Sequence, residues 1–197
     1  MIQITQKERE ALLMLFKNFT NFYNANSIGK ELGISHVGAQ KMLKRFAEQD
    51  IADAKIIGKS ITYKLRLEDE YVCQLITFLL ADEANTHKRW KEEFKGMFKK
   101  GRIILIYGSA IKDYAHSSDI DIMAIIDSKD ANDINRIIRK KEEVLPKKIH
   151  AIKLNHIDFL KSLKNKAMND IIKNAIVLYG QEKYVEMMKD ATSPKAY

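Results

Sequence analysis

Two short motifs in the second half of the sequence carry residue types that bind metal ions and phosphate groups. Gly108-Ser109 follows the apolar run 102–107, and Asp119-Ile-Asp121 opens a second apolar run that ends at Ile126. Residues two apart on a strand share a face, so the two aspartates would project side by side from the start of the second strand. Neighbouring carboxylates repel each other and lose hydration, a cost that a divalent cation relieves.

Together the two motifs predict a site for a nucleoside triphosphate and its metal ion. Mg²⁺, or Mn²⁺ in its place, prefers one or two carboxylates together with phosphate oxygens. A Gly-Ser turn offers unhindered backbone N–H groups and a hydroxyl to the terminal phosphates. The apolar run 102–107 is rich in β-branched residues, which predicts a strand buried on both faces.

Residues 107–122 read Tyr-Gly-Ser-Ala-Ile-Lys-Asp-Tyr-Ala-His-Ser-Ser-Asp-Ile-Asp-Ile. This segment closely resembles the motif of nucleotidyltransferases of the DNA polymerase β superfamily, particularly its small minimal members. In outline the resemblance extends over residues 101–190. It implies that Gly108 and Ser109 hold the β- and γ-phosphates and that Asp119 and Asp121 bind the metals. The implied reaction is in-line attack by a hydroxyl on the α-phosphate, with release of pyrophosphate.

The sequence departs from this family's pattern at two places. Members often carry Ala-Arg-Gly where this chain has Ile-Lys-Asp at 111–113. Lys112 would then take the place of the arginine in binding the nucleotide. Active members usually bring a third carboxylate from a later strand, but the matching segment 148–154 carries no acid. His150 takes the equivalent position. A neutral histidine can bind metal or act as a base near pH 7, or it can lack any catalytic role, and these alternatives stay open.

Helical patterns followed by two apolar strands occupy residues 5–67. A capping box at Thr5 and Glu8 starts the first helix, whose apolar stripe is Leu12, Leu15, Phe16 and Phe19. Ser27 is expected to cap a second, short helix that Gly33 closes, and Ser35 to cap a third. The strands 51–57 and 61–67 would form a hairpin around Gly58-Lys59-Ser60.

This order of elements, with the segment from Ser27 to Phe46 at its centre, resembles the winged helix-turn-helix family of DNA-binding domains. A helix fits the DNA major groove, where polar side chains reach base edges and basic ones hold phosphates. The resemblance implies six contacts to double-stranded DNA: base edges for His36, Gln40 and Lys41, and phosphates for Lys44, Arg45 and Lys59. A structural module or a protein-protein adaptor is the alternative.

The composition agrees with a polyanionic partner. The chain of 197 residues has a formal net charge of +8, and residues 1–68 carry 11 Lys plus Arg against 7 Asp plus Glu. Its single cysteine excludes an internal disulfide and a cysteine-built zinc site. No apolar run approaches the roughly 20 residues that a membrane span requires. We therefore expect a cytoplasmic protein without a membrane partner.

The sequence predicts an α+β chain of three parts. These are a winged helix-turn-helix at 1–68, a connecting helical segment at 69–100, and at 101–197 a nucleotidyltransferase-like domain with a mixed sheet and helices. The connecting segment has two apolar stripes, which could pack on either domain or form the seam of a homodimer.

Three functions stay open at this point. The first is a nucleotidyltransferase that the winged helix recruits to DNA, with an unidentified acceptor. The second is a transcriptional regulator whose second domain has lost catalysis and senses a nucleotide or mediates assembly. The third is a domain that pairs with a protein partner, as minimal nucleotidyltransferases do in toxin-antitoxin modules.

Overall fold

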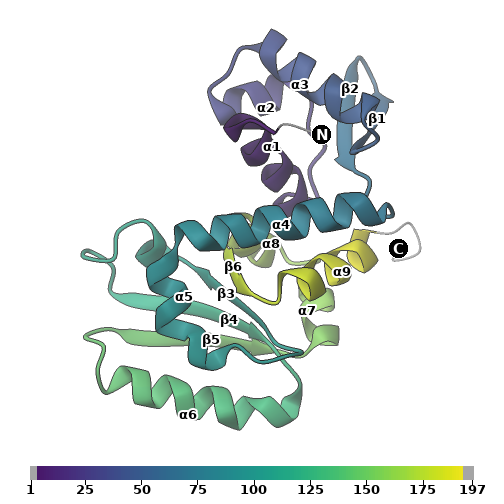
Figure 1. Cartoon of the computed structure of the whole chain (residues 1–197). Coiled ribbons are helices and arrows are strands. Elements are labelled where there is room, and N and C mark those ends of the chain that lie inside the picture. Colours follow the sequence, from purple (N-terminus) through teal and green to yellow (C-terminus); the bar gives the residue numbers. More distant parts are fainter. Residues whose placement is uncertain (1–3, 193–197) are drawn as a thin grey trace. The chain divides into compact units, whose positions relative to one another are not determined.

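A computed structural model describes residues 4–192 of the chain, which divides into two compact units after Leu79. The first unit contains helices and a two-stranded hairpin, and the second contains a four-stranded sheet with helices (Figure 1). The α+β fold class expected from the sequence is thus confirmed. Within the described range, no helix has both the length and the apolar character that crossing a membrane requires.

The first unit has the element order of a winged helix-turn-helix. Its elements are α1 (Gln6–Lys17), α2 (Ala25–Leu32), α3 (His36–Glu48), β1 (Ala52–Ile57), β2 (Ser60–Leu65) and the first part of α4 (Glu70–Thr86). The hairpin strands are antiparallel, with Ile57 opposite Ser60, so Gly58 and Lys59 form the tip as predicted. Gly58 has φ +58°, which favours glycine in a tight hairpin turn.

Two helix boundaries in this unit differ from the expectation. The capping box of Thr5 and Glu8 is confirmed, but α1 ends at Lys17, so Phe19 lies beyond it. The cap of α2 is Asn24 rather than Ser27. Asn24 Oδ1 accepts a hydrogen bond from the Ser27 backbone at 2.9 Å, and Ser27 Oγ accepts one from the Asn24 backbone at 2.9 Å. Because both residues are good caps, this reciprocal pair lets the helix begin nearly one turn earlier.

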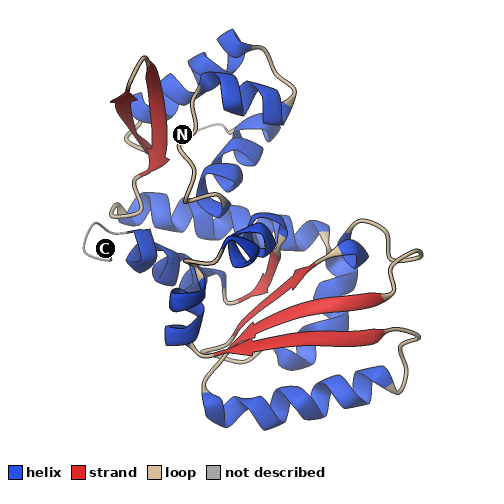
Figure 2. Ribbon diagram, turned by 180° about the vertical axis from the view of Figure 1, so that it is seen from behind, coloured by secondary structure: helices blue, strands red, loops and turns tan. Residues whose placement is uncertain are grey.

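The second unit is built around a mixed sheet in the order β5-β4-β3-β6 (Figure 2). Its strands are β3 (Ile103–Tyr107), β4 (Asp119–Ile125), β5 (Lys148–Leu154) and β6 (Ile176–Tyr179). β3 is antiparallel to β4 and to β6, whereas β4 and β5 are parallel. Its α-helices, apart from the end of α4, are α5 (Lys88–Phe94), α6 (Ala131–Glu142), α7 (His156–Ser162), α8 (Lys166–Asn174) and α9 (Gln181–Thr192). Short 3-10 turns are η1 (Lys95–Met97), η2 (Ser109–Ile111) and η3 (Ser128–Asp130).

Both faces of the sheet are buried, as the continuous apolar strands predict. On one face Ile104, Ile106 and Ile122 pack in a cluster with Phe94 of α5 and Ile134 of α6. On the other face Leu105, Met123 and Ile125 are fully buried too. Helices α8 and α9 contact β3, and α7 contacts β5. A sheet covered in this way can expose polar groups only at the strand ends and at its edges.

A buried arginine joins the beginning of β3 to the beginning of α6. The side chain of Arg102 is 1% exposed, and its guanidinium donates to Asp130 at 2.7 Å and to Asp133 at 2.6 Å. A buried charge is tolerated only when it is paired and hydrogen-bonded. This network therefore fixes α6 against the sheet.

Candidate metal centre and nucleic-acid interface

Three side chains from β4 and β5 meet at the start of the parallel strand pair. The register places His150 opposite Asp121, and Asp119 lies two residues before Asp121 on the same face. His150 Nδ1 is 3.2 Å from Asp119 Oδ2 and 3.9 Å from Asp121 Oδ1. One ligand atom from each residue lies within 4.8 Å of the others. The structure thus brings together the three residues that the sequence singled out as catalytic.

The electrostatics of this cluster disfavour two free carboxylates. Burial, and after it the charge of Asp119, raises the pKa of Asp121, which His150 only partly opposes. The neighbouring Tyr107 lies opposite Asp121 in the β3–β4 register. Burial and the charges of Asp121 and Asp119 raise the pKa of Tyr107 to about 12. A cation bound here would relieve both effects, because it favours the ionised form of a carboxylate beside it.

The Gly-Ser turn lies directly against the cluster. Gly108 has φ +82°, and a side chain on it would collide with the carboxylate of Asp121. Only glycine therefore fits where the backbone passes so close to this acid. Ser109 opens η2, and its carbonyl accepts the N–H groups of Lys112 and Asp113 at 3.0 Å each. The backbone thus turns sharply beside the two aspartates, as a phosphate cradle requires.

Lys112 itself is exposed, and no contact among residues 4–192 brings its side chain to Asp119 or Asp121. That Lys112 binds the nucleotide therefore stays a prediction. His116, in the loop between the two motif halves, is 86% exposed, and its Nδ1 lies 2.7 Å from Asp113 Oδ2. The loop between the two motif halves therefore presents polar side chains to solvent.

One lysine that the sequence analysis did not single out holds this loop in place. Lys147, just before β5, donates to the carbonyl of Ser117 and lies 3.5 Å from that of Ala115. Its ammonium also lies 4.8 Å from the centre of the Tyr114 ring, and the Arg89 guanidinium lies 3.7 Å from that same ring. The contacts depend on the folded path of the loop, so residue spacing gave no signal for them. They anchor the chain two residues before Asp119.

The donor set suits a divalent cation. Two carboxylates supply the hard oxygen ligands that Mg²⁺ and Mn²⁺ prefer, and the imidazole of His150 adds a nitrogen ligand. Nitrogen is accepted more readily by Mn²⁺ and later transition metals than by Mg²⁺. The residues present therefore fit a metal centre of two oxygens and one nitrogen, completed by phosphate oxygens or water.

The predicted DNA contacts lie on and beside α3. His36, Gln40 and Lys44 are exposed at intervals of four residues, which places them along one face of the helix. His36 and Gln40 also line a hollow of about 250 Å³ together with Lys59 from the hairpin tip. The structure thus joins the helix and the hairpin into one polar surface at these three residues.

The other predicted contacts lie outside this hollow. Lys41 is exposed, and Lys44 lies 3.5 Å from Glu48. Arg45 forms an ion pair with the buried Glu8 of the α1 capping box. The Arg45 guanidinium therefore forms a contact inside the first unit, where it connects α3 to the start of α1.

Comparison with known proteins supports the assignment of the second unit. The family model "Polymerase beta, Nucleotidyltransferase" matches residues 91–184, a little under half of the chain. This range includes the Gly-Ser turn, both aspartates and His150. A search of curated protein sequences finds no significant match.

Two solved structures show a likeness of low similarity. A mutant of ZitR from Lactococcus lactis is 17% identical, with a TM-score of 0.36 over 47% of this chain and 64% of that one. The adhesin competence repressor AdcR from Streptococcus pyogenes is 17% identical, with a TM-score of 0.36 over 47% of this chain and 69% of that one. The chain thus spans less than two thirds of the ZitR chain. The fold of the first unit is assigned from its own elements and register instead.

Three observations give the second unit the same identity. They are the sequence motif, the cluster that the strand register assembles, and the matching family model. Residues 91–184 form a nucleotidyltransferase domain of the polymerase β family, in a chain that begins with a winged helix-turn-helix fold.

Proposed function

We propose that the C-terminal domain, residues 101–197, transfers a nucleoside monophosphate from a triphosphate to an acceptor hydroxyl, with Mg²⁺ or Mn²⁺ as cofactor. The observation that carries this proposal is the cluster of Asp119, Asp121 and His150 beside the Gly108 turn. The winged helix-turn-helix, residues 1–68, would bind double-stranded DNA, and the helical segment 69–100 would connect the two domains.

Each residue of the site has a role that follows from its position. Asp119, Asp121 and Nδ1 of His150 would hold the metal, because these atoms face one another. When bound, a divalent ion supplies charge neutralisation at the phosphates and at the attacking oxygen. The backbone N–H groups at Gly108 and Ser109 would bind the β- and γ-phosphates and orient the triphosphate. Lys112, on the same turn, would contribute a positive charge to these phosphates.

Partly buried carboxylates and a fixed turn are an advantage for this reaction. The N–H groups at the Gly108 turn are set by the backbone, so they need no reorganisation as charge develops on the leaving pyrophosphate. Burial and the charge of Asp119 raise the pKa of Asp121, and a bound cation would oppose both effects. Binding of a metal-nucleotide complex would therefore be stronger than binding of the nucleotide alone.

A second function is favoured by one observation, the imidazole at the position where active members carry a carboxylate. The His150 side chain is 61% exposed, and on this reading it would not complete a catalytic metal pair. The domain would then bind a nucleotide with its metal but not transfer it. The chain would act as a DNA-binding regulator that responds to the bound nucleotide.

A labelling experiment separates the two functions. The full chain is incubated with each α-³²P-labelled nucleoside triphosphate, Mg²⁺ or Mn²⁺, and acceptors that include duplex DNA, the protein itself and small hydroxyl compounds. Transfer of label that is lost in Asp119→Asn and kept in Asp170→Asn, an exposed acid on α8, supports the enzyme. Metal-dependent nucleotide binding without any transfer supports the regulator. If wild type neither binds nor transfers any triphosphate, both functions are wrong.

A further inference from the structure

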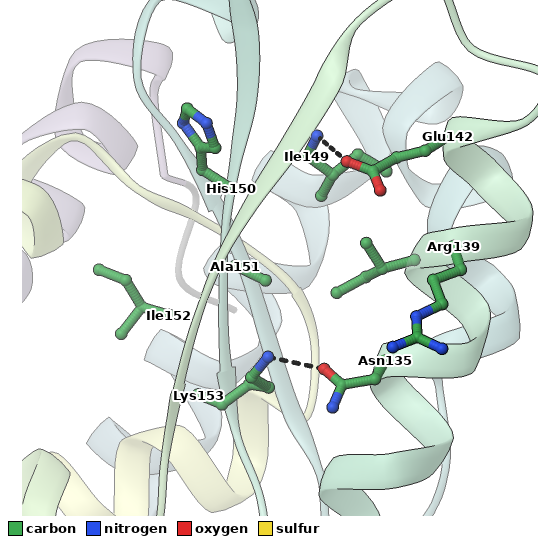
Figure 3. Close-up of a pocket in the computed structure, with 9 residues that line it drawn as sticks. Asn135, Arg139, Glu142, Ile149, His150, Ala151, Ile152 and Lys153 are labelled. Atoms are coloured by element: carbon green, nitrogen blue, oxygen red, sulfur yellow. Dashed lines mark hydrogen bonds between the residues drawn. The ribbon is translucent and has the colours of Figure 1, made fainter.

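A groove lies between α6 and the strand at the edge of the sheet, β5 (Figure 3). Its volume is about 590 Å³, within the range of ligand sites in proteins. A side-chain bridge borders each end. Glu142 Oε1 accepts the Ile149 N–H at 2.9 Å, and Lys153 Nζ donates to Asn135 Oδ1 at 2.7 Å. Between these bridges the groove exposes Arg139 on the helix and Ala151 on the strand.

The strand presents unused backbone groups to this groove. The N–H and C=O of one strand residue point to the same side, and successive residues alternate. The carbonyl of Leu154 accepts from Ile126 beside β4, whereas the N–H of Ile149 faces Glu142, so Ile149, Ala151 and Lys153 direct their backbone toward the open edge. By this alternation the N–H and the C=O of Ala151 point away from β4, toward the open edge. An open edge of this kind is a template for an added strand.

The charges around the edge decide what kind of strand fits. The Arg139 guanidinium is exposed and forms no ion pair within the described part of the chain, and Lys148 and Lys153 lie along the same strand. A second copy of this edge would bring like charges together, which disfavours self-pairing. The alternating amide groups of the edge match a polypeptide backbone rather than a nucleic acid. An acidic, extended peptide satisfies both the charges and the backbone.

We propose that the groove binds an extended acidic segment of another polypeptide, which adds to β5 as a strand. Acidic side chains of the segment would face α6 and meet Arg139, because the side chains of Ala151 and Lys153 lie on that side of the strand. The intervening side chains would face His150 and Ile152, which project away from α6 in Figure 3. Binding at this groove goes beyond the proposed transfer reaction and does not depend on it.

The groove adjoins the metal centre through His150. Neighbouring strands lie about 4.8 Å apart, so a side chain of the added strand would lie next to the His150 ring. That ring is 3.2 Å from Asp119. A bound segment would therefore cover the cluster from the open edge of the sheet, and its side chain at this point would face the nucleotide site.

Fluorescence anisotropy tests the proposal with four labelled probes on the full chain. These are a short peptide of alternating Glu and Val, the same peptide with alternate backbone nitrogens methylated, a peptide of alternating Lys and Val, and a single-stranded DNA of equal negative charge. Of the three peptides we expect only the first to bind, and any binding of the DNA should be the same in wild type and Arg139→Gln. Equal binding of the methylated peptide would overturn strand addition. Binding of the DNA that is weakened in Arg139→Gln would show a nucleic-acid groove instead. Failure of the Glu-Val peptide to bind would also overturn the proposal.

Two variants locate the binding site. Arg139→Gln should weaken the peptide roughly tenfold, the effect of losing one charge-assisted hydrogen bond. The matched control is Lys140→Gln, which removes a charge from the same helix at a residue outside the groove lining, and its affinity should stay within about twofold of wild type. Ala151→Pro removes an edge N–H but no bond to β4, so it should abolish binding while circular dichroism shows a folded chain. Unchanged affinity in Arg139→Gln would contradict the proposal, whatever the fold of the proline variant.

Discussion

His150 on β5 lies with its Nδ1 3.2 Å from the Oδ2 of Asp119 on β4, across a parallel strand pair. The contact places an imidazole beside two carboxylates, one of which has a raised pKa because it is buried next to the other. If the cluster binds a metal as proposed, a histidine at this point would change which ion it favours, since a nitrogen ligand would stand where active members carry an oxygen ligand.

Replacing His150 by aspartate should change the metal preference of the domain. In the wild type Mn²⁺ should raise the melting temperature more than Mg²⁺ does, because Mn²⁺ accepts a nitrogen ligand more readily. In His150→Asp the shift with Mg²⁺ should grow to equal or exceed the shift with Mn²⁺, because the third ligand is now a hard oxygen. His150→Ala should weaken Mn²⁺ binding roughly tenfold. The same preference in wild type and His150→Asp would mean that His150 is not a ligand.

Lys147 should support metal-nucleotide binding indirectly, because it anchors the loop that leads to Asp119. Lys147→Met removes the contacts to the carbonyls of Ala115 and Ser117 and to the Tyr114 ring. We expect weaker metal-nucleotide binding, by roughly fivefold to tenfold, because the backbone before Asp119 loses its anchor. Partial recovery in Lys147→Arg would show that the positive charge matters. Lys161→Met, an exposed lysine on α7, serves as the control and should bind like wild type.

Much of this site could be predicted from the sequence because its signals are local. A strand places residues two apart on one face, so Asp119 and Asp121 had to lie together, and Gly108-Ser109 followed an apolar run that could only be a buried strand. His150 needed one further step, the alignment of segment 148–154 with the aspartate strand, and its placement beside them agrees with the structure.

Other features depend on contacts between distant segments, and spacing alone could not predict them. Lys147 anchors a loop 30 residues earlier in the chain, and Arg139 meets β5 only because α6 packs beside it. At the start of α2 two good caps competed, and the choice of Asn24 over Ser27 rested on a reciprocal pair of hydrogen bonds that the sequence permits in either arrangement.

Removal of the buried arginine should destabilise the domain in a pH-dependent way. Hydrogen bonds from Arg102 are the main cause that lowers the pKa of both Asp130 and Asp133. A carboxyl with a lowered folded-state pKa contributes stability that is present above its ordinary pKa, near 3.8, and is lost as the pH falls through the lowered value. Arg102→Met should therefore lower the melting temperature at pH 7 by roughly 5 °C or more.

The difference between Arg102→Met and wild type should become smaller as the pH falls below about 4, where wild type also loses the contribution of these carboxylates. Thermal unfolding followed by circular dichroism between pH 3 and pH 7 measures this difference. A difference that is constant over the whole range would show that Arg102 acts by packing alone.

The polar surface formed by α3 and the hairpin tip should bind duplex DNA through salt-sensitive contacts. Loss of one phosphate contact in Lys59→Ala should weaken binding to all sequences and reduce the slope of log affinity against log salt by about 1. Gln40→Ala should instead reduce the preference for one sequence over others. The control is Lys7→Ala on α1, outside this surface, for which we expect the wild-type slope. Equal slopes in wild type and Lys59→Ala would exclude a phosphate contact at the hairpin tip.

The most direct test of the central claim is a calorimetric titration of Mn²⁺ into the full chain with a non-hydrolysable triphosphate analogue present. The claim is that Asp119, Asp121 and His150 form one metal centre at a nucleotide site. We predict saturable binding in wild type, a reduction of at least about a hundredfold in Asp121→Asn, and no change in Asp170→Asn. Equal Mn²⁺ binding by wild type and Asp121→Asn, or no binding by wild type, would contradict this account.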